Sequence, residues 1–172
     1  PGPAMANYKP KIAMNLSADN AFKDIPGDFT GNPPEDPSLS DPKLDDSSWK
    51  RMSLGIFDIP DNVGVHHAVF RKKFTVPAEW NHGKVCVFGT SESPGNGGVR
   101  RYMDGKPFGG QIVLDDLGGV LTSCSTHVLT TEIWGTEPPL GTTTPAWITY
   151  RPDPTTQQPL TSWTYANDCL TY

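Results

Sequence analysis

The sequence predicts an all-β fold, a β-sandwich built from short antiparallel strands. Short alternating or apolar runs recur along the 172 residues, and turns rich in the 17 glycines and 18 prolines separate them. No window keeps a period of 3.6 residues over three helical turns. With 35% hydrophobic residues and five tryptophans, the chain has the composition of a folded domain with a core.

The N-terminal third is expected to hold few strands. One early strand is predicted around residues 11–16. A long acidic, proline-rich loop follows over residues 24–47, because prolines forbid regular ladder bonding and aspartates suit turns. Ordered structure is expected to resume with residues 49–54.

The remainder of the chain reads as a series of strands separated by turns. Asp104-Gly105 predicts a tight hairpin within residues 99–110, because both residues tolerate positive φ. Further strands are expected at 68–77 (AVFRKKFTVP), 84–89 (KVCVFG), 111–117 (QIVLDDL), 127–135 (HVLTTEIWG), 146–152 (AWITYRP) and 160–167 (LTSWTYAN).

One residue of the hairpin conflicts with its pattern. Alternation places Arg101 on the same face as Val99 and Met103, where a core would be expected. An unpaired buried charge costs several kcal/mol. Arg101 is therefore expected at the sheet rim beside the Ser91–Gly98 loop or against a buried carboxylate, and we favour the rim.

Composition and length narrow the class of protein. A formal net charge of −5 without a basic patch argues against a nucleic-acid partner. No apolar run approaches 18 residues, so no membrane partner is expected. Residues 1–6 (PGPAMA) look like a protease-site and cloning remnant, and residues 7–172 are expected to form a single domain. Cys86, Cys124 and Cys169 allow one disulfide with a spare thiol or three free thiols.

The sequence assigns no catalytic residue. It contains no nucleophile elbow, HExxH motif, phosphate-binding loop or dinucleotide-binding motif. His66 and His67 point to opposite faces of a strand, and the neighbouring acids Asp45-Asp46 diverge in the same way. Glycoside hydrolysis needs two carboxylates that face each other across a cleft, and nothing singles out such a pair.

The order of motifs over residues 44–135 resembles the sugar-binding domain of family-2 glycoside hydrolases and related galactose-binding-like carbohydrate-binding modules. In that group an aspartate-rich turn leads to a tryptophan, here Trp49, and an aromatic strand ends in Val-Pro, here residues 70–77. A hairpin strand and a segment ending near E-x-W follow, here residues 101–109 and 116–134. The resemblance implies a jelly-roll β-sandwich of two antiparallel sheets. Arg101 departs from the pattern, which has a hydrophobic residue on the core side.

The resemblance favours a non-catalytic carbohydrate-binding module. Such a module would bind a polysaccharide or oligosaccharide and would be joined to the catalytic domain of a secreted or cell-surface parent enzyme. The alternative is a structural jelly-roll domain of a glycoside hydrolase with no ligand of its own, and a small lyase or esterase is a weaker third reading. The acidic loop is also a candidate Ca²⁺ site, because clustered carboxylates and carbonyls supply the oxygens that calcium prefers.

Sugar binding needs flat aromatic faces and planar hydrogen-bonding groups. The candidate ligand-binding residues are therefore Trp163, Trp147, Tyr165, Tyr150, Arg101, Arg100 and Arg151. The aromatic members of this set also fit two closing strands whose rings face the core. Trp49 and Trp134 are assigned to packing, and Trp80 to a partly exposed turn.

Overall fold

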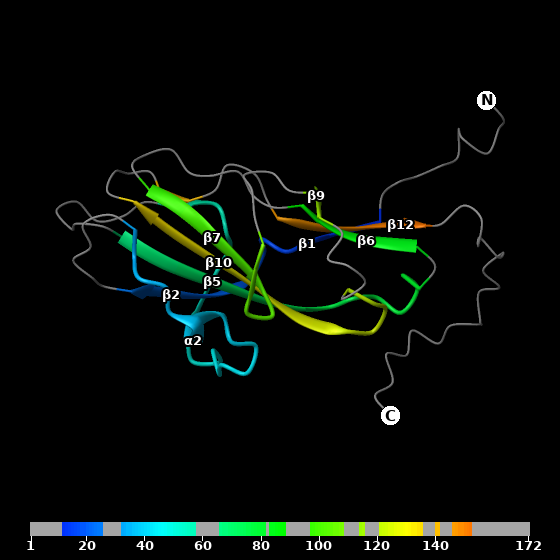
Figure 1. Cartoon of the computed structure of the whole chain (residues 1–172), viewed down its shortest axis with the longest axis horizontal. Coiled ribbons are helices and arrows are strands. Elements are labelled where there is room, and N and C mark those ends of the chain that lie inside the picture. Colours follow the sequence, from blue (N-terminus) through cyan, green and yellow to red (C-terminus); the bar gives the residue numbers. More distant parts are fainter. Residues whose placement is uncertain are drawn as a thin grey trace.

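The chain folds around a six-stranded antiparallel sheet. The computed structural model describes residues 12–25, 32–57, 66–81, 83–88, 97–108, 114–115, 121–135, 140–141 and 146–152. In spatial order the sheet consists of β3 (Lys50–Met52), β2 (Asn20–Ile25), β5 (His66–Thr75), β10 (Thr126–Gly135), β7 (Gly97–Met103) and β8 (Lys106–Phe108) (Figure 1).

Two smaller groups of strands complete the described fold. A four-stranded group has the order β1 (Ile12–Asn15), β12 (Trp147–Pro152), β6 (Gly83–Phe88) and β9 (Leu114–Asp115). The short strands β4 (Ile56–Phe57) and β11 (Leu140–Gly141) pair with each other. The all-β prediction is confirmed, and the six-stranded antiparallel sheet is its main element.

Most expected strands lie where the sequence pattern places them. The alternating run at 68–77 and the strand expected at 127–135 become β5 and β10, which pair along ten residues each. The structure adds β2, which was not expected, and a four-residue helix, α2 (Pro37–Ser40), inside the acidic loop. Asp36 caps this helix by accepting a hydrogen bond from the Ser38 amide. The strand expected at 160–167 lies outside the described residues.

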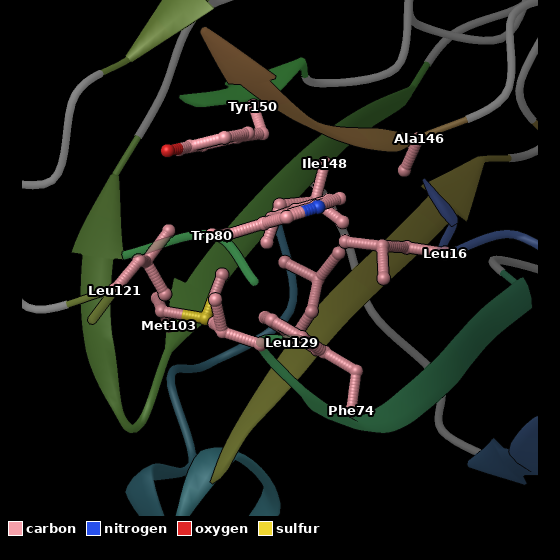
Figure 2. Packing of buried hydrophobic residues seen from close by; sticks show 10 residues of the cluster. Leu16, Phe74, Trp80, Met103, Leu121, Leu129, Ala146, Ile148 and Tyr150 are labelled. Atoms are coloured by element: carbon pink, nitrogen blue, oxygen red, sulfur yellow. The ribbon is translucent and has the colours of Figure 1, made fainter. Parts of the chain in front are cut away.

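A hydrophobic cluster joins the six-stranded sheet to β12. It consists of Leu16, Phe74, Val76, Trp80, Met103, Leu121, Leu129, Ala146, Ile148 and Tyr150. Figure 2 shows Trp80 at its centre, between Tyr150 and Leu129. The ring centroids of Trp80 and Tyr150 are 5.6 Å apart and nearly parallel. Trp80 is only 3% exposed, so its assignment to a partly exposed turn is wrong: the turn residue points inward and fills the core.

The predicted hairpin is present. Asp104 and Gly105 have φ angles of +52° and +80°, and they connect β7 to β8. The Asp104 carboxylate fixes the turn to β10, because Oδ1 accepts a hydrogen bond of 2.9 Å from the Val128 amide. The preferred rim position of Arg101 is wrong. Arg101 is 5% exposed: it lies in the buried end of β7, where residues 101–103 pair with β10 on one side and with β8 on the other.

A surface pocket beside Trp49

A pocket of about 390 Å³ lies at the β3 edge of the six-stranded sheet. This volume is within the range of small-molecule sites, about 300–1,000 Å³. The pocket is open to solvent, and apolar and polar side chains share its lining: Phe22, Lys23, Asp24, Ser48, Trp49 and Lys50. Two aromatic rings, two amines, a hydroxyl and a carboxylate therefore meet on one surface.

Strand register explains why these residues meet. In the antiparallel β2–β3 pair, Phe22 lies opposite Lys50, the first residue of β3. Following the chain backwards from Lys50 brings Trp49 alongside Lys23, which is the next residue of β2. The Lys23 ammonium accordingly lies 5.4 Å from the centroid of the Trp49 ring, within the range of a cation–π contact.

A tight turn before β3 presents Trp49. The Trp49 amide donates to the Asp46 carbonyl over 3.0 Å, and the Ser47 amide donates to Asp45 Oδ1 over 3.0 Å. The hydrogen bond from the Ser47 hydroxyl, followed by that from the Ser47 amide, lowers the pKa of the Asp45 carboxyl below its usual value. The aspartate-rich sequence before the tryptophan thus acts as a turn, as the motif predicts.

The sheet anchors this turn from the side. Arg71 of β5 donates through Nε to Asp46 Oδ2 over 2.7 Å. The same guanidinium donates to the backbone carbonyls of Leu39 (2.6 Å) and Asp41 (3.0 Å). Arg71 therefore ties the acidic loop and the turn that carries Trp49 to the centre of the sheet. On the other side of the pocket, Phe22 packs at 5.1 Å between ring centroids against buried Phe70.

Sequence reasoning missed this site. Trp49 was assigned to packing, but it is only partly buried and lines the pocket. The available signal was local: a tryptophan that follows an aspartate turn and precedes an exposed lysine. The other half of the pocket, from Phe22 to Asp24, comes from a strand that the sequence pattern did not reveal.

Arg100, one of the predicted ligand-binding residues, binds other groups of the protein. Its guanidinium donates to Glu132 Oε2 over 2.6 Å and to the Pro33 carbonyl over 2.9 Å, and it lies 4.8 Å from the Trp134 ring centroid. His67 Nε2 lies 3.2 Å from the same Glu132 oxygen. These contacts hold segment 32–34 against the sheet and give Arg100 a structural role, and its contact with a sugar stays a prediction.

The other predicted site residues do not come together as a site in the described structure. Tyr150 and Arg101 are buried, and Tyr150 belongs to the hydrophobic cluster, which argues against a stacking role for its ring. Trp147 and Arg151 both lie on β12. Trp147 is three positions before Tyr150, and Arg151 is four positions after Trp147. Trp163 and Tyr165 lie outside the described residues, and their binding roles stay predictions.

A serine, a histidine and an aspartate also lie in line near the hairpin. Ser125 Oγ is 2.6 Å from His127 Nε2, and His127 Nδ1 is 2.5 Å from Asp104 Oδ2. Ser125 Oγ also contacts the Thr122 carbonyl, which can only accept a hydrogen bond. The single hydroxyl hydrogen is therefore used in the turn, and the three side chains link that turn to the hairpin rather than presenting an activated nucleophile.

No group of three or more His, Cys, Asp or Glu side chains within the described ranges is placed to hold a metal ion. Residues 26–31 of the acidic loop are not among those ranges, so the calcium site stays a prediction. Among the described helices, none is long and apolar enough to span a membrane.

Comparison with known proteins relates the fold to glycoside hydrolases. No protein-family model matches the sequence, and no curated protein matches it significantly. Among solved structures, a glycosyl hydrolase family 2 member from Bacteroides cellulosilyticus matches 80% of this chain and 20% of its own, with a TM-score of 0.54 and 12% identity. The β-glucuronidase of Ruminococcus gnavus matches 83% of this chain and 29% of its own, with a TM-score of 0.55 and 15% identity.

A further β-glucuronidase of glycoside hydrolase family 2 gives a similar result: 80% of this chain, 17% of the enzyme, a TM-score of 0.55 and 15% identity. The chain thus spans less than a third of each of these enzymes. At such low identity the likeness shows the fold alone. The chain resembles a domain of family-2 glycoside hydrolases, which confirms at the level of fold the resemblance drawn from the motifs of residues 44–135.

Proposed function

We propose that the chain is a non-catalytic carbohydrate-binding domain, a jelly-roll β-sandwich that belongs to a larger polysaccharide-degrading enzyme. The observation that supports it best is the pocket beside Trp49, where an indole ring and hydrogen-bonding side chains meet on a fold shared with part of family-2 glycoside hydrolases. An indole accepts the apolar C–H face of a pyranose, and amines, hydroxyls and carboxylates bind its hydroxyl groups.

The role of such a domain is to raise the local concentration of substrate. A domain that binds a polysaccharide converts the encounter of the linked catalytic domain with that chain into an intramolecular event. This function requires no catalytic residue. The partners are accordingly a polysaccharide or oligosaccharide and the catalytic domain of the same parent chain, outside the cell or on its surface.

Affinity electrophoresis tests the proposal directly. The chain is run in native gels that contain soluble neutral and acidic polysaccharides, and at least one polysaccharide is expected to retard it. Trp49→Ala is expected to abolish the retardation, while Trp163→Ala tests the rival site in the C-terminal segment. Circular dichroism of each variant shows that the fold is intact.

The second candidate is a structural domain that packs on a catalytic domain and binds no glycan itself. The limited coverage of the matched enzymes, 17–30% of their length, favours it equally. Migration unaffected by every polysaccharide in the panel would contradict carbohydrate binding and leave this second candidate. A rise in melting temperature on adding Ca²⁺, reversed by a chelator, would support the calcium site proposed in the acidic loop.

A further inference from the structure

We infer that the pocket beside Trp49 accepts a sugar unit that carries an anionic group, a carboxylate or a sulfate. This inference rests on the proposed carbohydrate-binding function and specifies its ligand class. The whole chain is acidic, with a formal net charge of −5, but among the residues that the structure describes, two lysines and one aspartate line this pocket. The local charge is therefore opposite in sign to that of the protein as a whole.

Both lysines are available to a ligand. Lys23 and Lys50 are exposed, and within the described part of the chain neither ammonium has a carboxylate partner. Nearby arginines differ in this respect: Arg51 pairs with Asp19, and Arg71 pairs with Asp46. An ammonium group without a partner is a point charge that can bind a carboxylate or sulfate.

The position of Lys23 allows one ligand to contact both its ammonium group and the Trp49 ring. Its ammonium lies 5.4 Å from the centroid of the Trp49 ring. An anionic group bound to Lys23 therefore brings the sugar ring that carries it next to the indole. Asp24 borders the same pocket and can accept hydrogen bonds from the hydroxyl groups of that ring. A neutral sugar would use the indole and Asp24 but would offer neither ammonium group an anionic partner.

Calorimetric titration with matched pairs of probes tests the inference. The pairs are an oligogalacturonate and its fully methyl-esterified form, and a sulfated galactan oligosaccharide and its desulfated form. Each pair keeps the sugar ring and removes the charge. We expect the anionic member of at least one pair to bind about tenfold or more tightly, which corresponds to one hydrogen bond to a charged group.

Variants test whether the preference for the anionic probe arises in the pocket. Lys23→Gln and Lys50→Gln are expected to remove most of the preference for the anionic probe, and added salt is expected to weaken wild-type binding. Lys106→Gln, an equal change of charge at an exposed residue of β8 outside the pocket, is the control and is expected to bind as wild type.

The outcomes separate this inference from the proposed function. If charged and uncharged probes bind equally and Trp49→Ala weakens both, the anionic preference is overturned and carbohydrate binding stands. If only neutral polysaccharides retard the chain, the anionic preference is likewise overturned and carbohydrate binding stands. If an anionic probe binds but neither lysine variant affects it, this site is overturned. If no glycan binds, both proposals fail.

Discussion

Arg71 Nε lies 2.7 Å from Asp46 Oδ2, and this ion pair links the middle of the six-stranded sheet to the turn that carries Trp49. Only 1% of the Arg71 side chain is exposed, against 29% for Asp46. Two backbone carbonyls, those of Leu39 and Asp41, accept two further hydrogen bonds from the guanidinium. A buried arginine thus organises a segment that has almost no regular secondary structure of its own.

Replacing this arginine is expected to destabilise the domain. Arg71→Met leaves the Asp46 carboxylate and two carbonyls without their donor, at a cost of about 3 kcal/mol, the lower end for a broken buried pair because Asp46 is partly solvated. Urea denaturation measures the change. Arg51→Met removes the exposed pair with Asp19 and serves as the control, with stability close to wild type. Equal stability of the two variants would contradict the anchoring role of Arg71.

Trp80 is expected to behave as a core residue. Trp80→Ala removes a side chain that stacks on Tyr150 within the hydrophobic cluster (Figure 2), and a loss of about 3–5 kcal/mol is expected. Tyr150→Phe keeps the stacked ring and is expected to cost much less. Thermal melting of both variants provides the measurement. A stable Trp80→Ala variant would place this tryptophan at the surface, as the sequence pattern suggested.

Asp104 combines a turn conformation with two side-chain contacts. Asp104→Ala loses the acceptors for the Val128 amide and His127 and places alanine at a φ of +52°, so a loss of about 2–3 kcal/mol is expected. Asp104→Asn keeps an acceptor and tolerates positive φ, so its loss should be clearly smaller. Chemical denaturation compares the two, and an asparagine variant as unstable as the alanine variant would refute this explanation.

The pKa of the Asp19 carboxyl depends on its contact with Arg51. The hydrogen bond from Arg51, followed by the charge of the same guanidinium, lowers the pKa of the Asp19 carboxyl below its usual value. A lowered native pKa stabilises the fold above the unfolded pKa of about 3.9, and this contribution is lost as the pH falls through the native value. Arg51→Gln is expected to raise the Asp19 pKa, as carboxyl NMR titration would show. An unchanged Asp19 titration would mean that the contact is absent in solution.

Several elements of the fold could be predicted from local patterns. The run that became β5 alternates with a period of two, and Asp104-Gly105 has the residues that a tight hairpin turn needs. These signals are contained within a few consecutive residues. The same is true of the aspartate turn before Trp49, in which Ser47 and Trp49 donate to residues two and three positions earlier.

The pocket could not be predicted in the same way. Lys23 and Trp49 are 26 residues apart, and they meet only because β2 lies between β3 and β5 in the sheet. Strand order depends on which strands bury apolar surface together, and no short stretch of sequence contains that information. The burial of Arg101 was misjudged for a related reason, since alternation gives the face of a residue but not whether other segments cover that end of the strand.

The sequence by itself determined the all-β character, most strand positions, the hairpin turn and the turn before Trp49, because alternation and turn chemistry act between neighbouring residues. Only the tertiary structure decided that Trp80 and Tyr150 stack in the core, that Arg71 holds Asp46, and that Lys23 lies over Trp49. Each of these contacts joins residues at least 25 positions apart. They form when strand pairing and apolar burial bring distant segments together, which is a property of the whole chain.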